Sequence, residues 1–142
     1  MPMESDVGTL GDFEMDRLLA ASRGAYEHSY SPYSKFRVGA AVLVSDGRVF
    51  TGANVENASY GLTVCAERVA IFSAVAAGVT RLVALAVSMG SPTKTVGEQM
   101  PCGACRQVMT EFMPGDAIIL LGGQAICRLE ELLPRPFVLS GL

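Results

Sequence analysis

Three of the four cysteines lie in two short segments whose residue types suit metal binding. Cys102 and Cys105 are separated by two residues, and Cys65 stands two positions before Glu67. Two thiolates three positions apart at a loop-to-helix junction can bind one metal ion together, and Zn²⁺ is their usual partner in a reducing cell. These segments therefore predict a zinc site beside a carboxylate.

Both segments are expected at the start of a helix. Cys65 falls in the first turn of a helix predicted over residues 63–77, and the pair of cysteines begins another over 103–112. The dipole at a helix N-terminus favours a thiolate, so two helix starts aimed at one point would gather three thiolates around one ion. Three protein ligands leave a fourth tetrahedral position for water, which distinguishes a catalytic zinc site from a structural one.

Two other interpretations of these cysteines stay open. A Cys-x-x-Cys pair also carries out thiol–disulfide exchange, although the thioredoxin-like arrangement places it directly after the first strand of a βαβ unit. Cys127 or His28 could supply a fourth ligand and close the site, which would make it structural. A free cysteine in a strand is usually a small buried hydrophobe, and a histidine at the end of a helix usually has a capping or surface role.

The apolar pattern predicts the elements that must position these side chains. Helices are expected over 12–28 with Asp12 as N-cap, over 63–77 and over 103–112, with a helical turn over 129–133; strands are expected over 37–44, 48–53, 82–87, 117–121 and 125–128, and a loop over 88–100. This order predicts an α/β fold, a three-layer α/β/α sandwich around a five-stranded mixed sheet. Residues 1–11 are expected to form a flexible tail, and residues 12–142 a single domain.

Composition limits the class of protein. The 142 residues carry 11 Lys and Arg against 14 Asp and Glu, a formal net charge of −3, and half of them are hydrophobic. The chain is too apolar to be disordered and too acidic for a general nucleic-acid binder. Its apolar runs are shorter than the ~18 residues of a membrane span, and its acidic first thirty residues leave no room for a secretory signal, so a cytoplasmic protein is expected. The high apolar content predicts contact with another subunit.

Five motifs together resemble the small homotetrameric cytidine deaminases. They are Cys65-Ala66-Glu67, Pro101-Cys102-x-x-Cys105-Arg106-Gln107, Ser31-Pro32-Tyr33-Ser34-x-Phe36, the run from Thr51 to Tyr60 that contains Asn54 and Glu56, and Glu131-Leu132-Leu133-Pro134. The pairing of Cys-x-Glu with Pro-Cys-x-x-Cys is a known signature of zinc deaminases, and this chain resembles them in carrying it.

The resemblance implies a cytidine deaminase-like fold and an activity. The expected reaction is hydrolysis of cytidine and 2′-deoxycytidine to uridine and 2′-deoxyuridine with release of ammonia, a step of pyrimidine salvage. One Zn²⁺ per subunit, held by Cys65, Cys102 and Cys105, would present a bound hydroxide to C4 of the base. Glu67 would shuttle protons between water, N3 and the leaving amine, and Arg68 would donate hydrogen bonds to the sulfurs.

The resemblance also assigns the substrate pocket. Asn54 and Glu56 match ligands of the ribose 3′-hydroxyl, and Phe36 matches a ring that packs against the nucleoside. The backbone of Ala66 would help to read the edge of the base.

Tyr60 and Phe137 match aromatic residues that the family contributes across subunit boundaries, so a homotetramer with shared active sites is implied.

Three features depart from the usual pattern. Arg37 stands where the family usually has proline, the Gly122-Gly123 hairpin is short, and residues 137–142 lack the usual acidic ending.

Alternative functions remain. A blasticidin S-type nucleoside deaminase would share the zinc motifs, although the Glu56–Tyr60 run fits the cytidine enzymes better. A tRNA or DNA deaminase would need a basic surface and usually carries a histidine in place of Cys65. A non-enzymatic structural zinc-binding module is the alternative from a different class.

Overall fold

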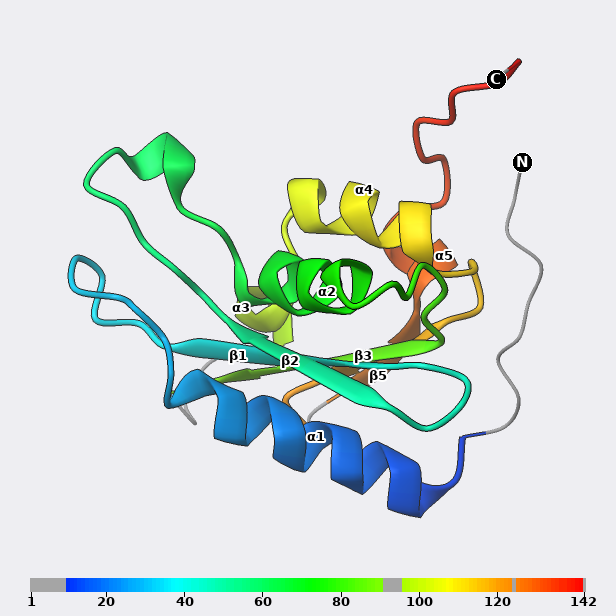
Figure 1. Cartoon of the computed structure of the whole chain (residues 1–142), viewed down its shortest axis with the longest axis horizontal. Helices are drawn as coiled ribbons and strands as arrows, with labels where there is room; N and C mark the ends of the chain where they lie inside the picture. Colours follow the sequence, from blue (N-terminus) through cyan, green and yellow to red (C-terminus); the bar gives the residue numbers. More distant parts are fainter. Residues whose placement is uncertain (1–9, 91–95, 124, 142) are drawn as a thin grey trace.

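A five-stranded mixed sheet lies between helices on both of its faces (Figure 1). The computed structural model describes residues 10–90, 96–123 and 125–141, so most of the tail expected over 1–11 lies outside the described residues. The helices are α1 (Asp12–Tyr26), α2 (Ala66–Ala76), α3 (Val96–Gln99), α4 (Gly103–Phe112) and α5 (Leu129–Leu132), with a 3₁₀ turn, η1 (Tyr60–Leu62). The strands are β1 (Val38–Leu43), β2 (Val49–Ala53), β3 (Ala84–Met89), β4 (Ile118–Leu121) and β5 (Ala125–Arg128).

The strand order is β2-β1-β3-β4-β5, with β3 and β4 parallel and the other neighbours antiparallel. This confirms the predicted three-layer α/β fold with a mixed sheet.

None of the helices in the described part of the chain has both the length and the apolar character needed to cross a bilayer.

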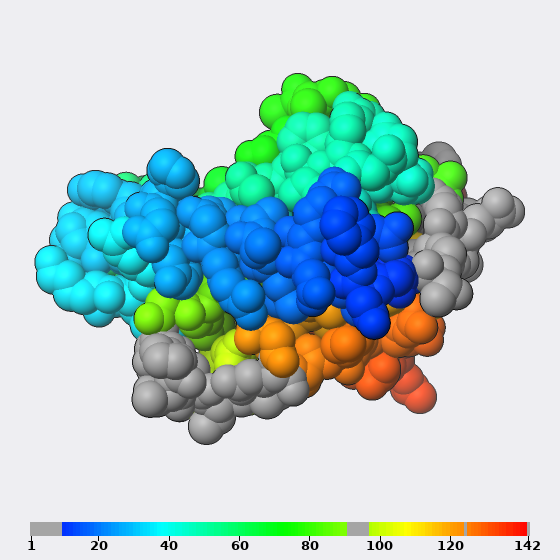
Figure 2. Space-filling view, turned by 90° about the horizontal axis from the view of Figure 1, so that it is seen from below, coloured from blue at the N-terminus to red at the C-terminus, as the bar shows by residue number. Residues whose placement is uncertain are grey.

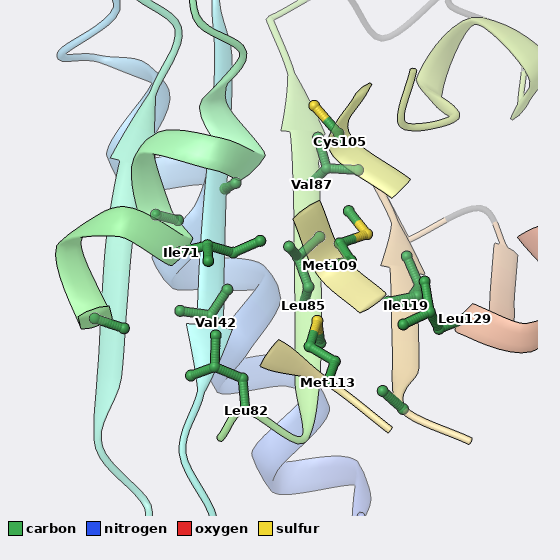
Figure 3. Close-up of a cluster of buried hydrophobic side chains, with 14 of the residues drawn as sticks. Val42, Ile71, Leu82, Leu85, Val87, Cys105, Met109, Met113, Ile119 and Leu129 are labelled. Atoms are coloured by element: carbon green, nitrogen blue, oxygen red, sulfur yellow. The ribbon is translucent and has the colours of Figure 1, made fainter. Parts of the chain in front are cut away.

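Burial on both faces explains why β1 is apolar throughout. All six of its residues are buried, and alternate side chains enter two separate cores. Ala40 and Val42 face the core under α2 and α4 (Figure 3), whereas Ala41 and Leu43 face the core under α1. Figure 2 shows α1 lying across that second face, with the orange β4–β5 region beside it. A strand covered on both sides has no position at which a polar side chain would meet water.

Two glycines let the helices approach the sheet at backbone distance. A Cβ added at Gly39 would lie 2.1 Å from the carbonyl oxygen of Ser22 in α1. A Cβ added at Gly52 would lie 2.3 Å from the backbone nitrogen of Ala70 in α2. Real Cβ atoms do not approach so closely, so glycine is required at both positions by the spacing of the layers.

The second helix starts three residues later than its apolar pattern predicts. Val64 exchanges two backbone hydrogen bonds with Val55, of 3.0 and 2.9 Å, and is therefore extended. The helix begins at Ala66, which makes Cys65 its N-cap rather than a residue of its first turn. The bridge closes the loop that follows β2 and fixes the backbone immediately before Cys65.

Other boundaries also differ from the prediction. Gly11, not Asp12, is the N-cap of α1, and the Gly11 nitrogen donates a 2.6 Å hydrogen bond to the Glu14 carboxylate. The helix ends at Tyr26 rather than at residue 28. Strand β3 continues through Ser88, which was expected in a loop; the buried Ser88 hydroxyl lies 2.6 Å from that of Ser22. The short elements η1 and α3 were not expected.

The contact between Gly52 and α2 predicts a measurable stability change. Gly52→Ala should lower the free energy of unfolding by about 1–3 kcal/mol, because the new methyl group forces α2 away from β2. Gly24→Ala is the matched control. Gly24 lies inside α1 with nothing within 4 Å of an added Cβ, so alanine there should stabilise by about 0.5–1 kcal/mol. Urea unfolding at one protein concentration measures both; equal effects would contradict the packing described.

Candidate metal centre

Three cysteine sulfurs converge where α2 and α4 begin. Cys65 is the N-cap of α2, Cys102 is the N-cap of α4, and Cys105 lies in the first turn of α4. The Cys102 and Cys105 sulfurs are 3.5 Å apart, those of Cys65 and Cys102 are 3.9 Å apart, and all three lie within 4.8 Å of one another. The cysteines are free thiols, so the cluster is not a disulfide.

The spacing fits a single tetrahedral zinc ion. Zn–S bonds of about 2.3 Å at tetrahedral angles separate the sulfurs by about 3.8 Å. Within the described residues, no fourth cysteine, histidine or carboxylate joins the group. Cys127 lies on β5 with its sulfur 3.9 Å from the Ile119 carbonyl oxygen, and His28 follows the end of α1. The site therefore has three protein ligands, and the exposed Cys102 leaves one side open to solvent.

The protonation of the three sulfurs bears on metal binding. A hydrogen bond from the Cys105 thiol, together with the charge of Arg68, lowers the pKa of Cys65 to about 5. The same hydrogen bond, together with burial, raises the pKa of Cys105 above its usual range. Without a cation the cluster thus holds a thiolate next to a thiol that keeps its proton. A divalent ion allows all three sulfurs to ionise, which is the state that binds zinc.

Two of the ligands stand at helix N-caps, and this position also stabilises the thiolate form. An N-cap residue usually has an oxygen that accepts a hydrogen bond from the first turn. The sulfurs of Cys65 and Cys102 make no such bond and remain directed into the cluster. The positive ends of two helix dipoles therefore meet at the thiolates and stabilise their charge.

Arg68 lies beside the cluster, one helical turn after Cys65. Its Nη2 donates a 3.5 Å hydrogen bond to the Cys65 sulfur. This bond and the charge of the neighbouring thiolates raise the pKa of Arg68. Three thiolates and one Zn²⁺ carry a formal charge of −1, and the guanidinium offsets it.

Glu67 is almost completely buried, with 5% of its surface exposed. Burial raises the pKa of Glu67 from 4.5 to about 7, and the nearby charge of Cys65 acts in the same direction. A carboxyl group with a pKa near neutrality can both hold and release a proton under physiological conditions. Glu67 therefore has the protonation behaviour of a general acid–base group.

Asn54 is buried and bound to the segment that precedes β1. Its Oδ1 accepts hydrogen bonds from the Val38 nitrogen, at 3.0 Å, and from the Ser29 hydroxyl. Its Nδ2 donates to the Phe36 carbonyl oxygen at 2.9 Å. One N–H of the carboxamide has no partner among the described residues.

Glu56 is bound to the same region of the chain. Its Oε1 accepts hydrogen bonds from the Tyr33 and Ser34 nitrogens, at 3.0 and 3.1 Å, and its Oε2 accepts one from the Ser34 hydroxyl. The Ser34 bonds lower the pKa of Glu56, so the group is a carboxylate at neutral pH. Oε2 keeps room for one more donor.

The other expected pocket residues lie in different surroundings. Ala66 is fully buried at the start of α2, and Phe36 is half-buried against the core. Tyr60 is 76% exposed in η1, with its ring centroid 6.4 Å from that of Tyr33. Phe137 is 73% exposed in the C-terminal segment. Figure 1 shows η1 and that segment on opposite sides of the helical layer, so the two segments lie apart within one subunit.

The arrangement also includes residues to which the sequence assigned no role. Ser29 and Ser34 hold the side chains of Asn54 and Glu56 in place. Arg106 and Gln107, which follow the second cysteine segment, bind backbone groups of distant residues. Ser34, Arg106 and Gln107 stand in the shared motifs, and this was the signal that the sequence offered. Their hydrogen-bond partners could not be predicted, because these lie up to thirty residues away.

Comparison with known proteins agrees with this geometry. Residues 14–121 match the family model of the cytidine and deoxycytidylate deaminase zinc-binding region. A cytidine deaminase of Halalkalibacterium halodurans is 49% identical over 130 residues, which cover 87% of this chain and 95% of that protein. The crystal structure of cytidine deaminase from Mycobacterium tuberculosis shares 44% identity with a TM-score of 0.78, covering 92% of this chain and 100% of that one. The crystal structure of cytidine deaminase from Burkholderia pseudomallei shares 44% identity with a TM-score of 0.77, and the match covers 86% of this chain and 98% of that one.

The three-ligand site predicts which cysteines retain zinc. Cys65→Ser, Cys102→Ser and Cys105→Ser should each reduce bound zinc from about one per subunit to near zero after dialysis against a mild chelator, because a site with two thiolates binds weakly. Cys127→Ser and His28→Ala are the controls and should retain it. Elemental analysis of the purified variants measures the metal, and loss of zinc from either control would contradict an open site.

Proposed function

This chain belongs to the cytidine and deoxycytidylate deaminase family, and we propose that it hydrolyses cytidine and 2′-deoxycytidine to the corresponding uridine nucleosides and ammonia. The observation that carries the proposal is the open three-cysteine zinc site with the buried carboxyl of Glu67 beside it. In this reaction a C4–O bond replaces the C4–N bond of the base, so both a nucleophile and proton transfer are required.

The three sulfurs would hold the zinc ion, which would supply an activated water because coordination lowers the pKa of water towards 7. Glu67 would take one proton from this water and pass it to N3 of the pyrimidine ring as the water oxygen adds to C4. The same carboxyl would then take the remaining proton from the new C4 hydroxyl group and pass it to the amine, which leaves as ammonia as the C4–N bond breaks and the C4 carbonyl forms. The raised pKa of Glu67 suits both directions of transfer.

Arg68 and Ala66, also at the start of α2, have supporting roles in the proposed reaction. Arg68 binds the Cys65 sulfur and reduces the negative charge of the ligand set, which keeps the zinc ion an effective Lewis acid. The backbone of Ala66, between a zinc ligand and Glu67, is placed to contact the edge of the base. One turn of helix would thus hold the metal, move the proton and orient the ring.

Asn54 and Glu56 suit recognition of one sugar hydroxyl. They flank Val55, which is extended because it bridges Tyr30 and Val64, so both side chains leave the backbone on the same face. Asn54 has one donor left and Glu56 has one acceptor position left. A hydroxyl group needs this combination, and in our proposal the group is the ribose 3′-hydroxyl, with Phe36 packing against the nucleoside.

The exposed aromatic residues support a shared active site. Tyr60 and Phe137 are mostly exposed, and the segments that carry them, η1 and the C-terminal segment, lie on opposite sides of the helical layer (Figure 1). Each has exposed apolar neighbours, Tyr33 and Leu62 for Tyr60 and Val138 and Leu139 for Phe137. An exposed patch of several apolar side chains marks a surface that contacts a partner. We propose a homotetramer in which these rings complete the pockets of neighbouring subunits. The three thiolates require reducing conditions, so a cytoplasmic role in pyrimidine salvage is part of the proposal.

The role of Glu67 predicts a separation of metal binding from turnover. Glu67→Gln should lower kcat for cytidine by at least about 10²-fold, because the amide cannot exchange the proton, while zinc stays at about one per subunit. Ammonia release and elemental analysis on the same sample measure the two quantities. A variant with bound zinc and near-normal turnover would show that another group moves the proton.

The shared pocket predicts that activity depends on assembly. Dilution should reduce turnover per subunit in step with the tetramer fraction measured by analytical ultracentrifugation, because each pocket loses its neighbour's rings. Mixed tetramers of Glu67→Gln and Phe137→Ala subunits should recover part of the activity that each variant lacks, since some pockets then contain an intact residue from each. Fully active monomers, or mixed tetramers without recovery, would contradict the proposal.

A further inference from the structure

The side chain of Gln107 holds the backbone of the C-terminal segment by two reciprocal hydrogen bonds. Its Nε2 donates to the Phe137 carbonyl oxygen at 3.0 Å, and its Oε1 accepts from the Phe137 nitrogen at 3.2 Å. A side-chain amide that binds both backbone groups of one residue acts as a neighbouring strand would. The residue that it holds is the exposed aromatic of the proposed pocket.

Little else fixes this segment. Among the described residues, the segment 134–141 makes two hydrogen bonds, and Gln107 is the partner in each of them. A cavity of about 600 Å³ lies where the segment faces α4 and α5, and Met113, Leu129 and Leu133 contribute to its lining. Figure 1 shows the chain leaving the body of the protein beyond α5. Both hydrogen bonds that fix the Phe137 backbone therefore depend on Gln107.

The two bonds run to the backbone of Phe137 and do not involve its aromatic ring. The ring of Phe137 is mostly exposed although its backbone is held. A contact that served only the stability of the subunit would be expected to bury the ring, because burying a phenylalanine side chain is worth about 1.5–3 kcal/mol. The arrangement instead presents the ring outward at a defined place.

That place is set by the same helix that binds the metal. Gln107 follows the zinc ligand Cys105 by two residues on α4. Its neighbour Arg106 donates hydrogen bonds of 2.8 Å to the carbonyl oxygens of Pro101, just before the ligands, and of Leu132, where the C-terminal segment begins. The start of the segment and its aromatic residue are thus both fixed relative to the metal centre.

From this geometry we propose that Gln107 is a positioning residue that fixes the C-terminal segment so that the Phe137 ring reaches the active site of a neighbouring subunit. The proposal rests on the proposed function, in which that ring contacts the substrate. Gln107 itself touches neither the metal nor the reacting atoms, and it acts through the backbone of Phe137.

The test replaces Gln107 with a side chain of similar length that cannot form these bonds. Gln107→Met should lower kcat/KM for cytidine by about tenfold, mainly through a higher KM, with zinc content and tetramer fraction unchanged. Glu111→Gln is the matched control, because Glu111 lies one turn further along the same face of α4 and lines the same cavity. It should leave kcat/KM unchanged. Wild-type kcat/KM in Gln107→Met would overturn the proposal.

A double-mutant cycle separates positioning from general stability. Phe137→Ala should reduce kcat/KM by at least as much as Gln107→Met, and the combined variant should be no worse than Phe137→Ala alone, because no ring remains to be positioned. Losses that multiply in the combined variant would show that Gln107 acts independently of Phe137 and would overturn the proposal.

Hydrogen exchange tests the contact without using activity. The amide of Phe137 in the wild-type holoenzyme should exchange about tenfold more slowly than in Gln107→Met, while amides within α4 remain equally protected in both. Equal exchange at Phe137 would overturn the proposal. A wild-type protein that protects this amide but releases no ammonia from cytidine would instead refute the proposed function and leave the contact confirmed.

Discussion

Mutual repulsion among three thiolates is the constraint on which the structure depends. Sulfurs within 4.8 Å of one another can all carry negative charge only where positive charge surrounds them. The protein supplies it from the N-terminal ends of α2 and α4 and from Arg68, and zinc supplies the rest. The fold must therefore bring the starts of two helices, far apart in sequence, to one point. This requirement explains why both helices lie on the same face of the sheet.

Close packing keeps these helix starts in place. Gly52 allows α2 to contact β2 at backbone distance, and the Val55–Val64 bridge fixes the chain just before Cys65. A shift of α2 would move the ligand, the proton-transfer group and the arginine together, because Cys65, Glu67 and Arg68 lie within four residues at the start of this helix. Geometry at the reacting atoms is sensitive to displacements of about 1 Å. The stability of the layers and the chemistry of the site thus depend on the same contacts.

Most of the fold could be predicted from the sequence because its elements have clear apolar patterns and punctuating glycines and prolines. The buried run of β1 and the amphipathic α4 are local signals. The start of α2 was missed because Val64 continues the apolar pattern, whereas its pairing with Val55 is a long-range contact. The cysteine cluster was predicted from spacing and resemblance. The bonds of Asn54, Glu56 and Gln107 were not predicted, since each joins residues separated by at least sixteen positions with no periodic signal.

X-ray absorption spectroscopy at the zinc edge tests the central claim most directly, because it counts the atoms bound to the metal. An open site made by two helix N-termini predicts three sulfur atoms at about 2.3 Å and one oxygen at about 2.0 Å. Addition of a nucleoside that mimics the hydrated base should change the distance of the oxygen ligand and leave the three sulfur distances unchanged. Four sulfur ligands, or three sulfurs with an imidazole, would show a closed structural site and would contradict the account.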